Sequence, residues 1–229
     1  MNTQNDYPSS ATEREPSLMR GGPFYRAQRA VKLIRPNQWN IGRRVMFAIA
    51  VGWLPLLLFT TLFNPSGLVS LLKDYRVHSR MLIAVPVLLL GQALMESRFR
   101  SVVAYITEGD LLAAPHRARM DDIFAMLLRL RDSLIPELAI VILLIAHTST
   151  SLTAFLDATP WVGKGAGADL HLTLAGWYAV LVSATMFQFL LGLSLWKWLI
   201  WTLFAFRFSR LNLKLVPTHP DQHGGLAWV

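Results

Sequence analysis

The feature that most constrains this chain is a stretch of 27 residues without a charge, between Asp169 and Lys197. A helix needs about 20 apolar residues to cross the hydrocarbon core of a bilayer, so this stretch is long enough. Trp177 and Trp196 stand near its two ends. At a rise of ~1.5 Å per residue a helix separates these tryptophans by roughly 28 Å, close to the hydrocarbon thickness. Because tryptophan favours the headgroup level, the pattern predicts a membrane-spanning helix within residues 170–206.

Three further apolar stretches predict an all-α integral membrane bundle of about four transmembrane helices. They cover residues 45–63, 81–95 and 138–156. The second has only 15 residues between Arg80 and Glu96. An arginine side chain can reach the interface from within a span, so we favour a span there over a re-entrant helix. With 53% hydrophobic and only 16% charged residues, the composition is not that of an ordinary soluble domain.

The segments outside the spans differ in character. Residues 1–22 are polar and are expected to form a disordered tail. Residues 23–44 begin with a basic amphipathic helix, which predicts a helix in the membrane interface; a solvated helix against a cytosolic partner is the alternative. Residues 96–133 are expected to be a polar cytoplasmic loop, in which the apolar face of 121–134 predicts a second surface helix. Residues 207–229 form a tail on the cytoplasmic side of the predicted bundle 45–206.

The Lys and Arg residues outside the spans predict the orientation, because cytoplasmic segments carry the excess of positive charge. The N-terminal segment, the loop 96–133 and the tail together hold 17 of them, against 4 in the two remaining loops. These groups alternate along the chain, so four spans place both termini in the cytoplasm. The formal net charge of +8 therefore indicates topology and contact with anionic lipid headgroups, and we expect no nucleic-acid partner.

Polar side chains within the spans are the first candidates for function, because hydrocarbon disfavours them. Gln92, His147 and Gln188 are candidates for one intramembrane polar site that lines a transport path. A histidine at that depth could relay protons or bind an ion. The alternative is that His147 is satisfied by a neighbouring Ser, Thr or Gln188 in a helix–helix contact, and we favour this reading.

Three charged residues lie at the ends of the predicted spans. Lys197 stands between two tryptophans, and we interpret it as a side chain that reaches water at the interface. Glu96 and Glu137 lie at cytoplasmic ends, where we expect ion pairs with Arg98 and Arg131. All three have a structural interpretation that needs no chemistry.

The most distinctive motif lies in the tail, where residues 217–225 read Pro-Thr-His-Pro-Asp-Gln-His-Gly-Gly. In an extended chain His219, Asp221 and His223 project to the same side and could hold a divalent metal with an open position. We favour the alternative of a capped turn, in which the Asp221 carboxylate accepts backbone N–H bonds. A stoichiometric metal that is lost from a His219→Ala variant would contradict the turn and support the metal site.

The same residues carry a resemblance. The sequence Pro217-Thr218-His219-Pro220-Asp221, followed by Gly224-Gly225-Leu226, resembles a motif in a group of uncharacterised bacterial multi-pass membrane proteins. The resemblance covers this motif and the apolar helix before it. It implies an inner-membrane location and no particular activity. It also implies further membrane segments after the motif, in which case residues 1–229 are an N-terminal portion.

Four classes of function remain open. A structural or assembly subunit needs only interfaces, as a homo-oligomer or with other membrane subunits. A transport-associated component needs polar groups on a common path, and four spans are few for a secondary transporter. A membrane enzyme would depend on the His219 segment, and the sequence lacks G-x-S-x-G, P-loop and H-E-x-x-H signatures. A sensor would use the loop 96–133, which has no recognisable signalling motif. We therefore favour assembly or transport over catalysis.

Overall fold

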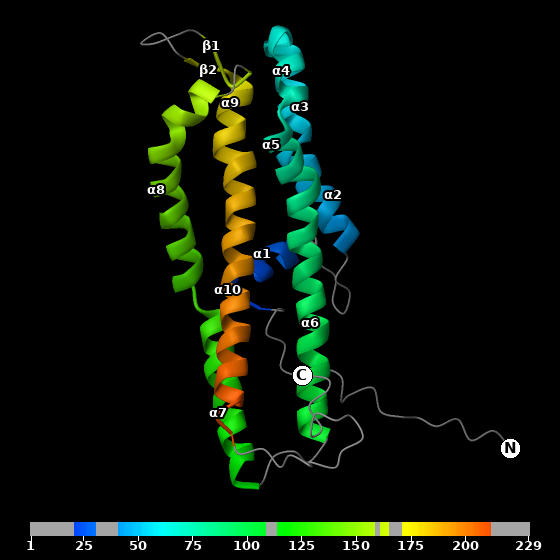
Figure 1. Cartoon of the computed structure of the whole chain (residues 1–229), viewed down its shortest axis with the longest axis vertical. Helices are drawn as coiled ribbons and strands as arrows, with labels where there is room; N and C mark the ends of the chain where they lie inside the picture. The colour runs from blue at the N-terminus through cyan, green and yellow to red at the C-terminus, as the bar shows by residue number, and fades with distance from the viewer. Residues whose placement is uncertain (1–20, 31–40, 109–113, 159–160, 165–170, 212–229) are drawn as a thin grey trace, which may run out of the picture. The chain divides into compact units, whose positions relative to one another are not determined.

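The computed structural model describes most of the 229-residue chain (Figure 1). The described residues are 21–30, 41–108, 114–158, 161–164 and 171–211. They are helical throughout, apart from turns and one short pair of strands. Among the described residues, three helical segments are long and apolar enough to cross a membrane, and they cover Ile41–Phe63, Tyr75–Ala104 and Leu174–Phe208. The protein is therefore an all-α membrane protein, as the sequence predicts.

The described chain divides into two compact units. The larger comprises Gly22–Ala93 and Ser133–Leu199, and the smaller comprises Leu94–Asp132 together with the chain from Ile200 onward. Two long helices, α6 (Val85–Glu108) and α10 (Thr185–Phe208), contribute to both units. Each unit is described by itself below.

The first predicted span is divided into two helices. α2 runs over Ile41–Gly52 and α3 over Leu54–Phe63, with Trp53 between them. Pro55 lies in the first turn of α3, where its missing N–H removes no intrahelical hydrogen bond. The proline that the sequence places inside one helix therefore begins a second one. The basic helix α1 (Pro23–Ala30) precedes this span and confirms the described part of the predicted helix.

The second span is longer than its uncharged core of 15 residues suggests. After a 3-10 turn (Pro65–Gly67), α4 covers Leu68–Lys73 and α5 covers Tyr75–His78. A π-helical turn over Ser79–Ala84 then joins α5 to α6 without a break. The helix therefore continues past the charged residues at both ends of the apolar stretch, and a span of 30 residues results.

The remaining helices follow the predicted order. α7 covers Ala114–Asp132 and α8 covers Ile135–Ala158, which contains the predicted third span. The strands β1 (Gly163–Lys164) and β2 (His171–Leu172) pair antiparallel. α9 (Leu174–Tyr178) and a π-helical turn (Ala179–Ala184) then lead into α10. Whether α8 crosses the bilayer as a fourth span stays a prediction.

The smaller unit is built on a cluster of packed aromatic rings. Phe99 on α6, Phe124 on α7 and Phe204 on α10 pack with ring centroids 5.2–6.4 Å apart. α7 consequently runs alongside α10 in Figure 1 and buries one face there. The expectation of a polar loop over 96–133 with a surface helix in it differs from this arrangement. Phe124 and Leu127 of the apolar face are buried, whereas Leu134 is exposed, and residues 96–108 continue α6 as a helix.

One end of the larger unit closes over a tryptophan. Trp161 and Val162 are fully buried in a cluster with Leu56 on α3 and Leu71 on α4. Gly176 on α9 lies so close to the chain at Val162 that a Cβ on it would collide with the Val162 carbonyl oxygen. A glycine is therefore required there to let α9 approach the turn before β1.

Candidate functional site

A buried amide joins α6 to α10 within the larger unit. Gln92 on α6 is 4% exposed. Its Nε2 donates to the Ser194 hydroxyl at 3.0 Å, and its Oε1 accepts from the Lys197 ammonium at 3.3 Å. Ser194 in turn donates to the Leu190 carbonyl at 2.8 Å. The amide thus uses both its donor and its acceptor on α10.

This cluster revises the interpretation of Lys197. Ser194 and Lys197 are three residues apart on α10 and so share the helix face that meets Gln92. The Lys197 side chain is only partly exposed, and its ammonium bonds a buried amide on the neighbouring helix. The prediction of a lysine that simply reaches water missed this contact. Polar bonds of this kind hold transmembrane helices together.

The other two residues of the predicted polar site lie in different surroundings. His147 is on α8 with an exposed side chain, whereas Gln92 is buried. Gln188 on α10 is half-buried, and its Oε1 has no hydrogen-bond partner among the described residues. The structure therefore joins Gln92 to Ser194 and Lys197, and it places His147 in a different environment.

The two carboxylates at span ends take partners other than those expected. Glu96 forms an ion pair with Arg100 at 2.7 Å, one helical turn further along α6, where side chains at i and i+4 face each other. Glu137 Oε1 accepts the backbone N–H of Phe24 at 3.0 Å. That N–H belongs to the first turn of α1, where helices have no intrahelical acceptor and favour negative charge. Glu137 therefore fixes α1 against the start of α8.

A histidine near the start of the second candidate span is held in one tautomer. The Trp53 indole Nε1 can only donate, and it lies 3.0 Å from His78 Nδ1. Nδ1 is therefore the acceptor, and Nε2 carries the proton toward the carbonyl oxygens of Leu71 and Leu72, each at 3.1 Å. His78 thus connects α5 with α4 and with Trp53, which lies between α2 and α3. The tautomer is assigned from these hydrogen bonds.

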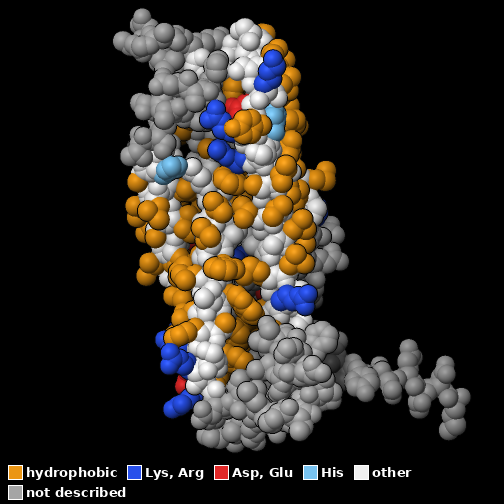
Figure 2. Space-filling view, viewed as in Figure 1, with side chains coloured by type: hydrophobic (Ala, Val, Ile, Leu, Met, Phe, Trp, Pro, Cys, Tyr) orange, Lys and Arg blue, Asp and Glu red, His pale blue; other side chains and the backbone are white. Residues whose placement is uncertain are grey.

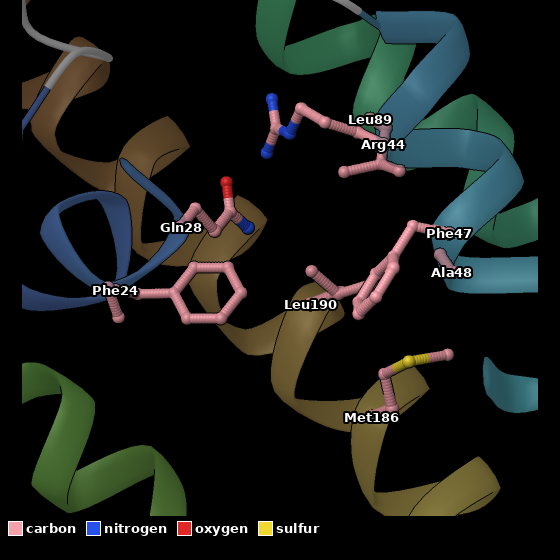
Figure 3. Close-up of a pocket in the computed structure, with 9 residues that line it drawn as sticks. Phe24, Gln28, Arg44, Phe47, Ala48, Leu89, Met186 and Leu190 are labelled. Atoms are coloured by element: carbon pink, nitrogen blue, oxygen red, sulfur yellow. The ribbon is translucent and has the colours of Figure 1, made fainter. Parts of the chain in front are cut away.

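A second candidate site, which the sequence did not reveal, is a pocket of about 320 Å³ in the larger unit. Figure 3 shows Arg44 and Gln28 on one side of it, with aromatic and aliphatic side chains on the other. Arg44 is 4% exposed and Gln28 is 8% exposed. The pocket is lined by Phe24, Ala27, Gln28, Arg44, Phe47, Ala48, Leu89, Met186 and Leu190.

The pocket arises from helical spacing on two elements. Phe24, Ala27 and Gln28 share one face of α1, and Arg44 and Ala48 are one turn apart on α2. The amphipathic pattern of α1 is visible in the sequence. The sequence does not show that α1 packs against α2, because nothing in either helix specifies the other as its neighbour.

The tail motif lies outside the described residues, so the metal hypothesis for His219, Asp221 and His223 stays a prediction. Within the described part of the chain, no group of three His, Asp or Glu side chains could hold a metal ion. No protein-family model matches the chain, and no curated protein or solved structure shows a significant match. The resemblance through the tail motif therefore stays a prediction as well.

Proposed function

We propose that this protein is a structural or assembly subunit of a membrane complex, and that α8 is the helix that contacts its partner. The observation that carries the proposal is the exposure of α8. Its described part from Ile135 to Thr148 contains no buried residue, although it is strongly apolar. Leu138, Ile142 and Leu143 are 60%, 58% and 68% exposed.

The other spans differ from α8 in this respect. α6 buries Val85 and Leu89 at 0% and 2% exposure, and α10 buries Leu190 and Leu193 at 4% each. Transmembrane helices associate mainly through close packing and interhelical hydrogen bonds. α8 contributes Ile140, whose side chain packs where Gly192 leaves room on α10, and the Glu137 contact with α1. Most of its apolar surface is therefore open to lipid or to another protein (Figure 2).

The buried amide also favours assembly over transport. Gln92 was a candidate for a polar path, but both ends of its amide bond side chains of α10. Groups that hydrogen-bond across helices stabilise a bundle, and they are not presented to a passing ion or solute. The hydrogen bonds of Gln92 therefore support a structural role over a transport path.

The proposal is tested by a photo-crosslinking amino acid placed at Ile142 in the full chain, in the membrane of origin. We expect covalent products with a protein, either a second copy or another subunit, that mass spectrometry identifies. The matched control is the same amino acid at Leu58 on α3, which is 52% exposed. Lipid products alone at position 142, or the same protein products from both positions, would contradict the role of α8.

The proposal includes an orientation: a bacterial inner membrane with both termini in the cytoplasm. It is supported by the 17 Lys and Arg residues on one set of segments against 4 on the other. The chain has no cysteine, so Ser17→Cys and Gly165→Cys each introduce a single thiol. In intact cells a membrane-impermeant thiol reagent should label position 165 and leave position 17 unlabelled until the cells are lysed. Labelling at 17 alone would reverse the orientation.

A further inference from the structure

We infer that the pocket at Arg44 binds an anionic phospholipid, with the lipid phosphate on the Arg44 guanidinium and part of an acyl chain against the apolar lining. This inference does not depend on the assembly role, because the pocket lies in the larger unit between α1, α2, α6 and α10 and does not involve α8. It assigns the protein a specific lipid site beyond general contact with charged headgroups.

The polar side of the pocket suits a phosphate. Arg44 and Gln28 are both more than nine-tenths buried, and Figure 3 shows the guanidinium and the amide directed toward each other. A guanidinium presents N–H donors in a planar fork that matches two phosphate oxygens at once. A carboxamide adds a further neutral donor. Arg44 and Gln28 therefore place one cation and one amide beside a pocket whose lining is almost entirely apolar.

The depth of Arg44 suits a lipid headgroup. Arg44 is in the first turn of α2, at the start of the candidate span Ile41–Phe63. The end of a span lies at the level of lipid phosphates, where arginine side chains are favoured. The exposed Arg26 and Arg29 of α1 stand beside the pocket-lining residues of the same helix. Such basic residues attract anionic lipid near a charged membrane surface.

The apolar side of the pocket favours a lipid over a free anion as the ligand. Phe24, Phe47, Leu89 and Leu190 supply hydrocarbon and aromatic surface that a phosphate ion would leave unused. An acyl chain gains by burying against such surface. Phe47 is 50% exposed, so the pocket reaches the surface of the chain, where a lipid can enter sideways. A volume of about 320 Å³ lies at the lower end of the range for ligand pockets and suits part of one lipid.

The test is native mass spectrometry of the delipidated full chain, titrated with phosphatidylglycerol or with phosphatidylcholine of the same acyl chains. We expect phosphatidylglycerol to bind tightly and phosphatidylcholine to bind with an affinity at least about tenfold lower. A charge-assisted hydrogen bond contributes on the order of a factor of ten or more to the binding constant. Arg44→Gln should lower the affinity for phosphatidylglycerol by a similar factor. Arg43→Gln is the matched control, because Arg43 is the adjacent arginine, is exposed and does not line the pocket.

A second variant tests the pocket without touching the charge. Ala27→Phe fills the apolar side from an exposed position, so it should lower phosphatidylglycerol binding and leave the fold intact. It also keeps the test decisive if Arg44→Gln fails to fold. Displacement of the lipid by millimolar inorganic phosphate would overturn the acyl-chain contact. Equal affinity for the two lipids, or equal loss in Arg43→Gln and Arg44→Gln, would overturn the site.

Discussion

Replacing Trp161 with alanine should lower the free energy of unfolding by about 3–5 kcal/mol, the range for a large aromatic side chain removed from a core. Trp161 is fully buried. Its indole Nε1 donates to Asp74 Oδ2 at 3.0 Å, and its carbonyl oxygen accepts from the Thr173 hydroxyl at 3.1 Å. The side chain thus fills the space between α3, α4 and α9 and also satisfies a carboxylate. Alanine would leave a cavity and remove the donor to Asp74.

The indole bond and the packed volume can be separated with Trp161→Phe. Phenylalanine retains most of the apolar volume and loses the N–H donor and part of the ring volume, so it should cost less than alanine, about 1–2 kcal/mol. Equilibrium unfolding in mixed detergent micelles, followed by circular dichroism, measures all variants on one scale. Trp177→Ala, at 49% exposure, serves as the control for loss of a surface tryptophan. If the free energy of unfolding of Trp161→Ala lay within ~1 kcal/mol of that of this control, a core role for Trp161 would be contradicted.

The lengths of the apolar stretches predicted the helical spans well. Backbone N–H and C=O groups without hydrogen-bond partners are costly in hydrocarbon, and a helix is the structure in which a single segment pairs all of its own groups. The length of an apolar stretch does not predict the residues at which a helix begins and ends. α5 and α6 continue through Arg80 and Glu96 because the chain keeps its own backbone hydrogen bonds there. Nor did it find Trp161, which lies between two predicted spans where no periodic pattern marks it as core.

Partners of charged and polar residues were predicted less well than helices. Glu96 meets Arg100 because the two are one turn apart on one helix, a spacing that the sequence does show. Glu137 meets the α1 backbone, and Gln92 meets Ser194 and Lys197, across more than 100 residues. Such contacts depend on which helices are neighbours, and hydropathy carries no information on that. The pocket at Arg44 was missed for the same reason.

Gln92→Leu and Gln188→Leu should change stability in different directions, although they replace the same residue type in two spans. Gln92→Leu removes the acceptor of the Lys197 ammonium and the donor to Ser194, so two partly buried polar groups lose a bond. Interhelical hydrogen bonds in membranes contribute about 0.6–1.7 kcal/mol, and bonds to charged groups lie at the upper end. We expect a loss of about 1–2 kcal/mol for this variant.

Gln188→Leu replaces an amide whose Oε1 is buried without a hydrogen-bond partner in the described part of the chain. Burying an unsatisfied polar group is costly, so an apolar side chain of similar size should be neutral or stabilising by up to about 1 kcal/mol. The same micelle unfolding assay compares the two variants, and Ser194→Ala combined with Gln92→Leu should add little to Gln92→Leu alone. Equal destabilisation by both leucines would mean that Gln92 holds no special contact, and the assignment of its amide to helix–helix bonding would be wrong.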